Sequence, residues 1–133
     1  MANGTALGSV DVTLPTNARA PAVARQVLRR FGSELPDGLL DDAALLLSEL
    51  VTNSVRYAAT GPGSRLRLRV ERRPAGIRVE VLDWGPGFSP RAARLRDDGG
   101  FGLLLVQRLA TRWGIEQTDT TRVWFEIAEH RAG

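Results

Sequence analysis

Apolar and polar residues alternate along several segments of the chain, and this two-residue period predicts β-strands. In R-L-R-L-R-V (65–70) and I-R-V-E-V (77–81), the apolar side chains fall on one side of the strand and the charged ones on the other. Only a short turn separates these segments, so we expect an antiparallel hairpin with one face in water. Further strands are predicted at 9–14, 112–117 and 122–127, and the last two form a second hairpin.

Elsewhere the apolar period lengthens to about 3.6 residues, which predicts helices. The first is capped by Thr16 or Asn17 and stops at Gly32, and a longer one occupies about 36–58. A third is expected at about 103–111. Because each helix has one apolar stripe and each strand one apolar face, we expect an α+β two-layer sandwich. Its mixed, mainly antiparallel sheet would be covered on one face by about three helices.

Length and composition are those of one globular domain. The 133 residues are 43% hydrophobic and 25% charged, which fits a single domain at 1–133 with its core at about 10–128. There is no cysteine, so disulfides are excluded. The apolar runs fall far short of the roughly 20 residues that cross a bilayer, and the N-terminus lacks the features of a signal peptide. A cytoplasmic protein with no membrane partner is therefore expected.

All 18 basic residues are arginine. Phosphate-binding schemes that depend on a lysine, such as the Walker A loop, are therefore excluded. The net charge of +3 is modest, so no nucleic-acid partner is expected. The row of arginines in 65–69 is interpreted as a solvated face, with a partner surface as the alternative.

Three segments carry residues suited to bind a nucleotide, and the first two lie on the long helix and after a strand. Glu49 and Asn53 are four residues apart, so their side-chain oxygens can face one hard cation and its waters. Asp83 follows the strand at 77–81 and can accept a hydrogen bond from an exocyclic amine such as that of adenine. Gly85 and Gly87 carry no side chains that would block a flat ring.

The third segment is D-G-G-F-G-L-L-L-V (98–106), which places Gly100 and Gly102 before a helix that opens at Leu103. Backbone N–H groups there can converge on an anion, and the helix N-terminus adds partial positive charge. Taken singly, each segment is more often an ordinary amphipathic helix, turn or loop. Their joint occurrence in this order favours a site for a magnesium nucleotide.

This order of motifs resembles that of the GHKL ATPase superfamily, which includes gyrase, heat-shock chaperone, histidine kinase and mismatch-repair ATPases. Within it, the chain is most similar to the compact bacterial anti-sigma-factor serine/threonine kinases. S-E-L-V-T-N-S-V-R-Y-A resembles their N box, D-W-G-P-G-F and G-F-G-L-L-L-V their two glycine boxes, and R-V-W-F-E-I their last strand. The resemblance covers about residues 10–128 and implies a Bergerat-type sandwich.

The resemblance also implies the ligands and the roles of the site residues. The cofactors would be ATP and Mg²⁺, with Asn53 coordinating the metal between the phosphates. Glu49 would be the general base, and Asp83 would bind the adenine amino group. The residues expected to line the base pocket and the phosphate site are Gly85, Gly87, Gly100, Gly102 and Leu103.

The activity implied by this likeness is an ATP-dependent protein serine/threonine kinase. Its expected partners are a sigma factor and an antagonist protein phosphorylated on serine, and analogy adds a homodimer as an option. The alternative is a non-catalytic module that binds ATP or ADP and acts through protein contacts. The ATP-binding end of a histidine kinase fits less well, because the only histidine, His130, lies near the C-terminus.

Three features depart from the family pattern. Tyr57 stands where the family often has a histidine. Arg122 stands where a small hydroxyl residue commonly precedes V-W-F, with Thr121 one position away. The segment between Gly87 and Gly100 is short, which implies a small lid over ATP.

Overall fold

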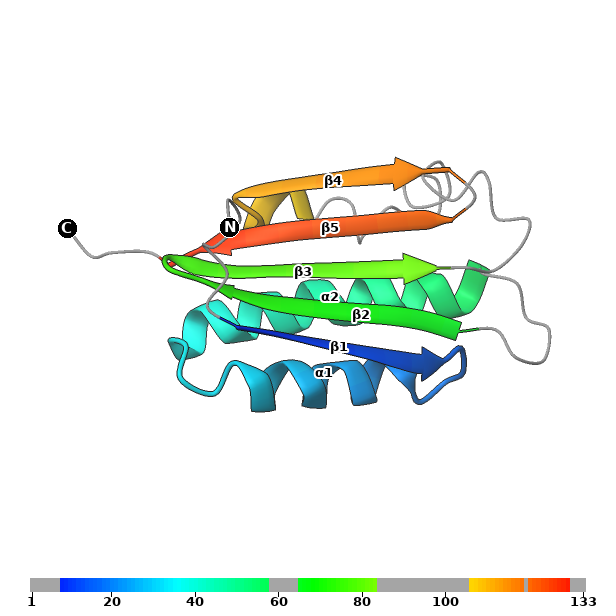
Figure 1. Cartoon of the computed structure of the whole chain (residues 1–133), viewed down its shortest axis with the longest axis horizontal. Coiled ribbons are helices and arrows are strands. Elements are labelled where there is room, and N and C mark those ends of the chain that lie inside the picture. Colours follow the sequence, from blue (N-terminus) through cyan, green and yellow to red (C-terminus); the bar gives the residue numbers. More distant parts are fainter. Residues whose placement is uncertain (1–7, 58–64, 84–105, 119, 130–133) are drawn as a thin grey trace.

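The computed structural model describes residues 8–57, 65–83, 106–118 and 120–129. Five strands form one sheet in the order β1-β2-β3-β5-β4; in Figure 1, α2 lies behind β2 and β3, and α1 runs below β1. Residues 106–109 are also helical. The elements are β1 (Gly8–Pro15), α1 (Ala20–Phe31), α2 (Asp37–Tyr57), β2 (Arg65–Arg73), β3 (Gly76–Asp83), β4 (Arg112–Gln117) and β5 (Thr121–Ala128).

The α+β two-layer sandwich predicted from the sequence is confirmed, with one change in the sheet. Every pairing among the described strands is antiparallel, so this sheet is not mixed. Strands β2 and β3 form the first predicted hairpin, and β4 and β5 form the second. The two hairpins join through β3 and β5, which are far apart in the sequence.

The start of α1 differs from the prediction, whereas its end agrees. The N-cap residue is Arg19, which makes no capping hydrogen bond through its side chain. Asn17 instead accepts a hydrogen bond from the Arg19 backbone N–H at 2.9 Å, so it closes the turn before the helix. At the other end, the Gly32 N–H donates to the Leu28 carbonyl oxygen at 2.8 Å and terminates the helix.

The core lies between the helices and the sheet face that they cover. Leu47 and Val51 of α2 are buried there together with Val79 of β3 and Phe125 of β5. Val106, in the helical segment 106–109, joins the same cluster. The apolar contact between α2 and the central strands therefore holds these strands in place.

Within the described ranges, no helix has the length and apolar content needed to span a membrane.

The other side of the sheet, here called the open face, carries charged residues in alternation with the core positions. Arginines outnumber carboxylates on it, and most carboxylates contact two arginines. Hydrogen bonds from Arg67 and Arg69 hold the pKa of the Asp11 carboxyl below its ordinary value. The open-face charges are Arg65, Arg67, Arg69, Arg73, Arg78, Arg112, Arg122, Asp11, Glu71, Glu80, Glu116 and Glu126.

A tryptophan covers part of this face near the edge strand β4. The Trp124 ring lies 4.2 Å below the Arg78 guanidinium carbon, a cation–π contact. A Cβ atom on Gly114 would come within 2.7 Å of the Trp124 indole nitrogen. The ring therefore packs on β4 because Gly114 has no side chain.

We predict that Gly76→Ala destabilises the fold by about 1–3 kcal/mol, because the new methyl group has no space. Gly76 pairs with Ala128, and a Cβ atom there would lie 2.1 Å from the Ile127 carbonyl oxygen. Denaturant unfolding measures the change. The matched control is Gly38→Ala, where the Cβ meets nothing within 4 Å, and it should stabilise α2 by about 0.5–1 kcal/mol. Equal stability of the two variants would contradict the prediction.

Candidate functional site

Two polar residues are buried side by side where β3 ends and β5 begins. Asp83 is the last residue of β3 and Thr121 the first of β5, and the two are directly paired. Each is 1% exposed. Alternation along β3 places Asp83 on the same side as Val79 and Val81, which is the face that the helices cover. A carboxylate and a hydroxyl thus share the covered face at one end of the sheet.

The structure distinguishes the two residues at the start of the last strand, Arg122 and Thr121, that the comparison with the family singled out. Arg122 pairs with Leu82 and lies on the open face. Thr121, one residue earlier, is the one that lies beside Asp83. Alternation back from the buried Val123 would have placed Thr121 on the covered face, but only the pairing of β3 with β5 shows that it meets Asp83.

The Thr121 hydroxyl is a buried polar group that the described part of the chain leaves unsatisfied. Its Oγ1 atom is buried and has no hydrogen-bond partner among the residues that the structure describes. Burial of a hydroxyl without a partner costs free energy, so such groups in native proteins commonly meet a ligand or a water. Thr121 therefore fits a role as a hydrogen-bonding group toward a bound molecule.

Glu49 and Asn53 lie on one flank of α2, and both are half-buried. On the other flank, Ser48 accepts a hydrogen bond of 2.7 Å from Arg25 of α1. At 100° per residue, Glu49 and Asn53 point away from that contact, along the border between the buried and the exposed arcs of the helix. The carboxylate and the carboxamide therefore share a flank that α1 leaves uncovered.

The predicted site residues that are described gather at one end of the molecule. Figure 1 shows the C-terminal ends of α2 and β3 and the start of β5 at the same end, and α2 contacts both strands. Asn53 lies in the last two turns of α2, Glu49 one turn earlier, and Asp83 closes β3. The remaining predicted site residues, Gly85, Gly87, Gly100, Gly102 and Leu103, lie outside the described residues, so their roles stay predictions.

Two oxygen-bearing side chains of α2 fit a metal ion that is bound together with a nucleotide. No group of three or more His, Cys, Asp or Glu side chains that could hold an ion occurs among the described residues. Mg²⁺ commonly takes one or two protein oxygens and completes its shell with phosphates and waters. Glu49 and Asn53 can supply such oxygens, so the residues fit Mg²⁺ bound together with ATP.

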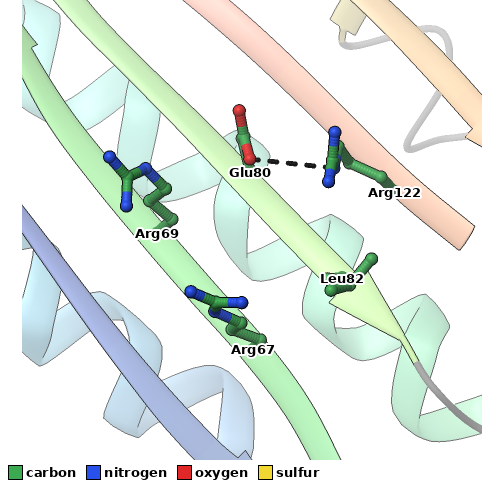
Figure 2. A pocket seen from close by; sticks show the side chains of 5 residues that line it. All are labelled: Arg67, Arg69, Glu80, Leu82 and Arg122. Atoms are coloured by element: carbon green, nitrogen blue, oxygen red, sulfur yellow. Dashed lines mark ion pairs between the residues drawn. The ribbon is translucent and has the colours of Figure 1, made fainter. Parts of the chain in front are cut away.

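Three hollows lined by described residues lie away from these groups. One is on the open face around Leu82 (Figure 2), and another surrounds the turn between β2 and β3. The third, of about 420 Å³, lies near the N-terminus of α2 and is lined partly by Asp41, Asp42 and Glu129. None of the three includes Asp83 or Asn53, so they are surfaces distinct from the candidate site.

Comparison with known families agrees with this arrangement. The model of the histidine kinase-like ATPase domain matches residues 14–127, which is most of the chain. The chain belongs to this family. As a histidine kinase-like ATPase domain, it is an ATP-binding regulatory domain of the GHKL type. No curated protein matches the chain significantly.

For this ATPase domain, we predict that Thr121→Val leaves the fold intact and raises the free energy of unfolding by up to about 1 kcal/mol. Valine has nearly the shape of threonine and removes a hydroxyl that is buried without a partner in the described part of the chain. Denaturant unfolding without nucleotide is the measurement. Thr13→Val, at an exposed position of β1, is the control and should change stability by less than about 0.5 kcal/mol. A clear loss of stability in Thr121→Val would mean that the fold uses the hydroxyl.

Proposed function

We propose that this domain is an anti-sigma-factor-type serine/threonine protein kinase that uses ATP and Mg²⁺ to phosphorylate an antagonist protein. The observation that carries the proposal is the buried pair of Asp83 and Thr121 at the sheet end that α2 reaches with Glu49 and Asn53. In an ATP-binding domain, groups at the junction of β3 and β5 would serve the adenine ring, and groups on α2 would serve the metal. We also propose a cytoplasmic location and a sigma factor as a second partner, both from the family likeness.

Asp83 and Thr121 would hold the adenine. The Asp83 carboxylate accepts a hydrogen bond from the exocyclic amine, and the Thr121 hydroxyl can donate to a ring nitrogen directly or through a water. Both groups are almost completely buried, which strengthens such bonds and excludes competing solvent. Gly85 and Gly87 would line the same pocket, and Gly100, Gly102 and Leu103 would lie near the phosphates.

Glu49 and Asn53 would serve the chemical step. Bound ATP and Mg²⁺ supply the phosphoryl group and the neutralisation of its charge. Asn53 would orient the metal through its side-chain oxygen. Glu49 would accept the proton of the attacking serine hydroxyl as that oxygen bonds to the γ-phosphorus and ADP departs. The absence of lysine leaves backbone amides and arginines to balance the remaining charge.

We predict that Asp83→Asn weakens ATP binding by about tenfold or more, because the new amide N–H₂ would face the adenine amine. Isothermal titration calorimetry with and without Mg²⁺ measures the affinity. Asp83→Asn should lose affinity under both conditions, whereas Asn53→Ala should lose it only when the metal is present. The matched control is Glu116→Gln, an exposed carboxylate on the other face of the sheet. Unchanged ATP affinity in Asp83→Asn would contradict the proposed adenine pocket.

We predict that Glu49→Gln lowers phosphoryl transfer by about 10²–10⁴-fold with little change in ATP affinity, because a general base is lost while the shape is kept. The assay follows labelled phosphate from ATP to a candidate antagonist protein, compared with a variant of it in which the target serine is alanine. Absence of transfer by the wild-type protein, with ATP binding intact, would support the non-catalytic ATP- or ADP-binding module instead.

A further inference from the structure

In one row of the open face, a leucine lies between two arginines, one on each neighbouring strand. Leu82 of β3 pairs with Arg67 of β2 on one side and with Arg122 of β5 on the other. Neighbouring strands are about 4.8 Å apart, so the backbones of the two arginine positions are separated by about 10 Å. Both guanidinium groups can therefore reach over the leucine toward a common point.

A hollow of about 220 Å³ lies at this point, lined by Arg67, Arg69, Glu80, Leu82 and Arg122. Figure 2 shows these side chains on the side of the sheet turned away from the helices, with the two arginine-bearing strands flanking β3. Its floor is apolar at Leu82, which is half-buried although it lies on the charged side of the sheet. The hollow thus combines an apolar floor with charged walls.

The charge that lines the hollow is unbalanced in favour of cations. The side chains of Arg67, Arg69 and Arg122 are 45%, 37% and 43% exposed, whereas that of Glu80 is 19% exposed. Glu80 is also shared, since it accepts a hydrogen bond of 3.0 Å from Arg78 and lies 3.8 Å from Arg122.

The other carboxylates that pair with these arginines belong to neighbouring positions of the open face. Arg67 and Arg69 share Asp11 of β1, Arg69 also contacts Glu71 of β2, and Arg122 contacts Glu116 of β4. None of these three carboxylates lines the hollow. An anion that entered above Leu82 would therefore meet three accessible guanidinium groups and one shielded carboxylate.

We propose that this hollow is a docking site for an acidic side chain of a protein partner, held between Arg67 and Arg122 with an apolar neighbour against Leu82. Guanidinium groups bind carboxylates through paired, charge-assisted hydrogen bonds. The leucine floor suits a segment in which acidic and apolar residues are adjacent. The site is separate from the proposed kinase chemistry and does not depend on it.

The surrounding charges favour this occupant over two others. Asp11, Glu71 and Glu126 interrupt the arginines of the open face, so a nucleic acid that extended across it would meet repulsion at each of them. A second copy placed face to face would bring two cation-rich surfaces together. A polypeptide can match this mixture of arginines and carboxylates, because its own sequence can place acidic and basic side chains opposite them.

The test uses a fluorescein-labelled peptide in which glutamate alternates with leucine, and a matched peptide with glutamine in place of glutamate. Fluorescence anisotropy at about 20 mM salt measures binding to the full chain, because exposed charges are weakly screened there. The glutamate peptide should bind more tightly, and Arg67→Gln combined with Arg122→Gln should weaken it about tenfold. Arg29→Gln combined with Arg30→Gln removes the same charge from exposed positions of α1 and should leave binding unchanged.

A further double variant and a second measurement show whether a loss of peptide binding is due to misfolding. Arg67→Lys combined with Arg122→Lys keeps the charge but loses the paired hydrogen bonds, so it should bind more tightly than the glutamine variant and more weakly than the wild type. ATP affinity measured in parallel reports the integrity of the fold. Equal binding of the two peptides, or wild-type binding by the folded glutamine variant, would overturn the proposal. So would a labelled DNA oligonucleotide that binds in place of the glutamate peptide, or self-association that only the glutamine variant loses. A loss of ATP binding alone would concern the proposed function and not this site.

Discussion

The apolar layer between α2 and the central strands is the contact on which the rest of the structure depends. Leu47 and Val51 of α2 lie in the same core as Val79 of β3 and Phe125 of β5, so one helix spans two strands that are distant in sequence. Because the buried arc of α2 must face the sheet, its half-buried flank is fixed as well. The position of Glu49 and Asn53 at the sheet end is therefore a consequence of core packing.

Alternation along the strands then separates two kinds of chemistry by the thickness of one sheet. Asp83 and Thr121 lie on the covered face, while their chain neighbours Leu82 and Arg122 lie on the open face. The covered face offers the buried polar groups that we propose hold adenine. The open face offers accessible guanidinium groups, which suit an anionic side chain. A single strand pairing aligns both sets, so neither can shift in register without the other.

The fold could be predicted largely from the sequence, because the periods of apolar residues that indicate helices and strands are local features. Both hairpins and the limits of α2 follow from alternation, turn residues and the Pro36–Asp37 start. The N-terminus of α1 was predicted wrongly, because Asn17 closes a turn before the helix and does not cap it. The meeting of Asp83 with Thr121 could not be predicted, since it depends on a pairing between distant strands. For the candidate site, the i, i+4 pair on α2 was visible in the sequence, while the register of β5 was not.

The strand order also determines when these groups come together as the chain folds. The β2–β3 and β4–β5 hairpins close short loops, whereas the pairing of β3 with β5 must close the connection from Asp83 to Thr121. Closing a longer loop costs more chain entropy, so local hairpins are expected to precede it. The carboxylate and the hydroxyl thus become neighbours only after the two hairpins have formed. A chain that has formed only its hairpins would already have most of its strand content but would lack the site proposed for adenine.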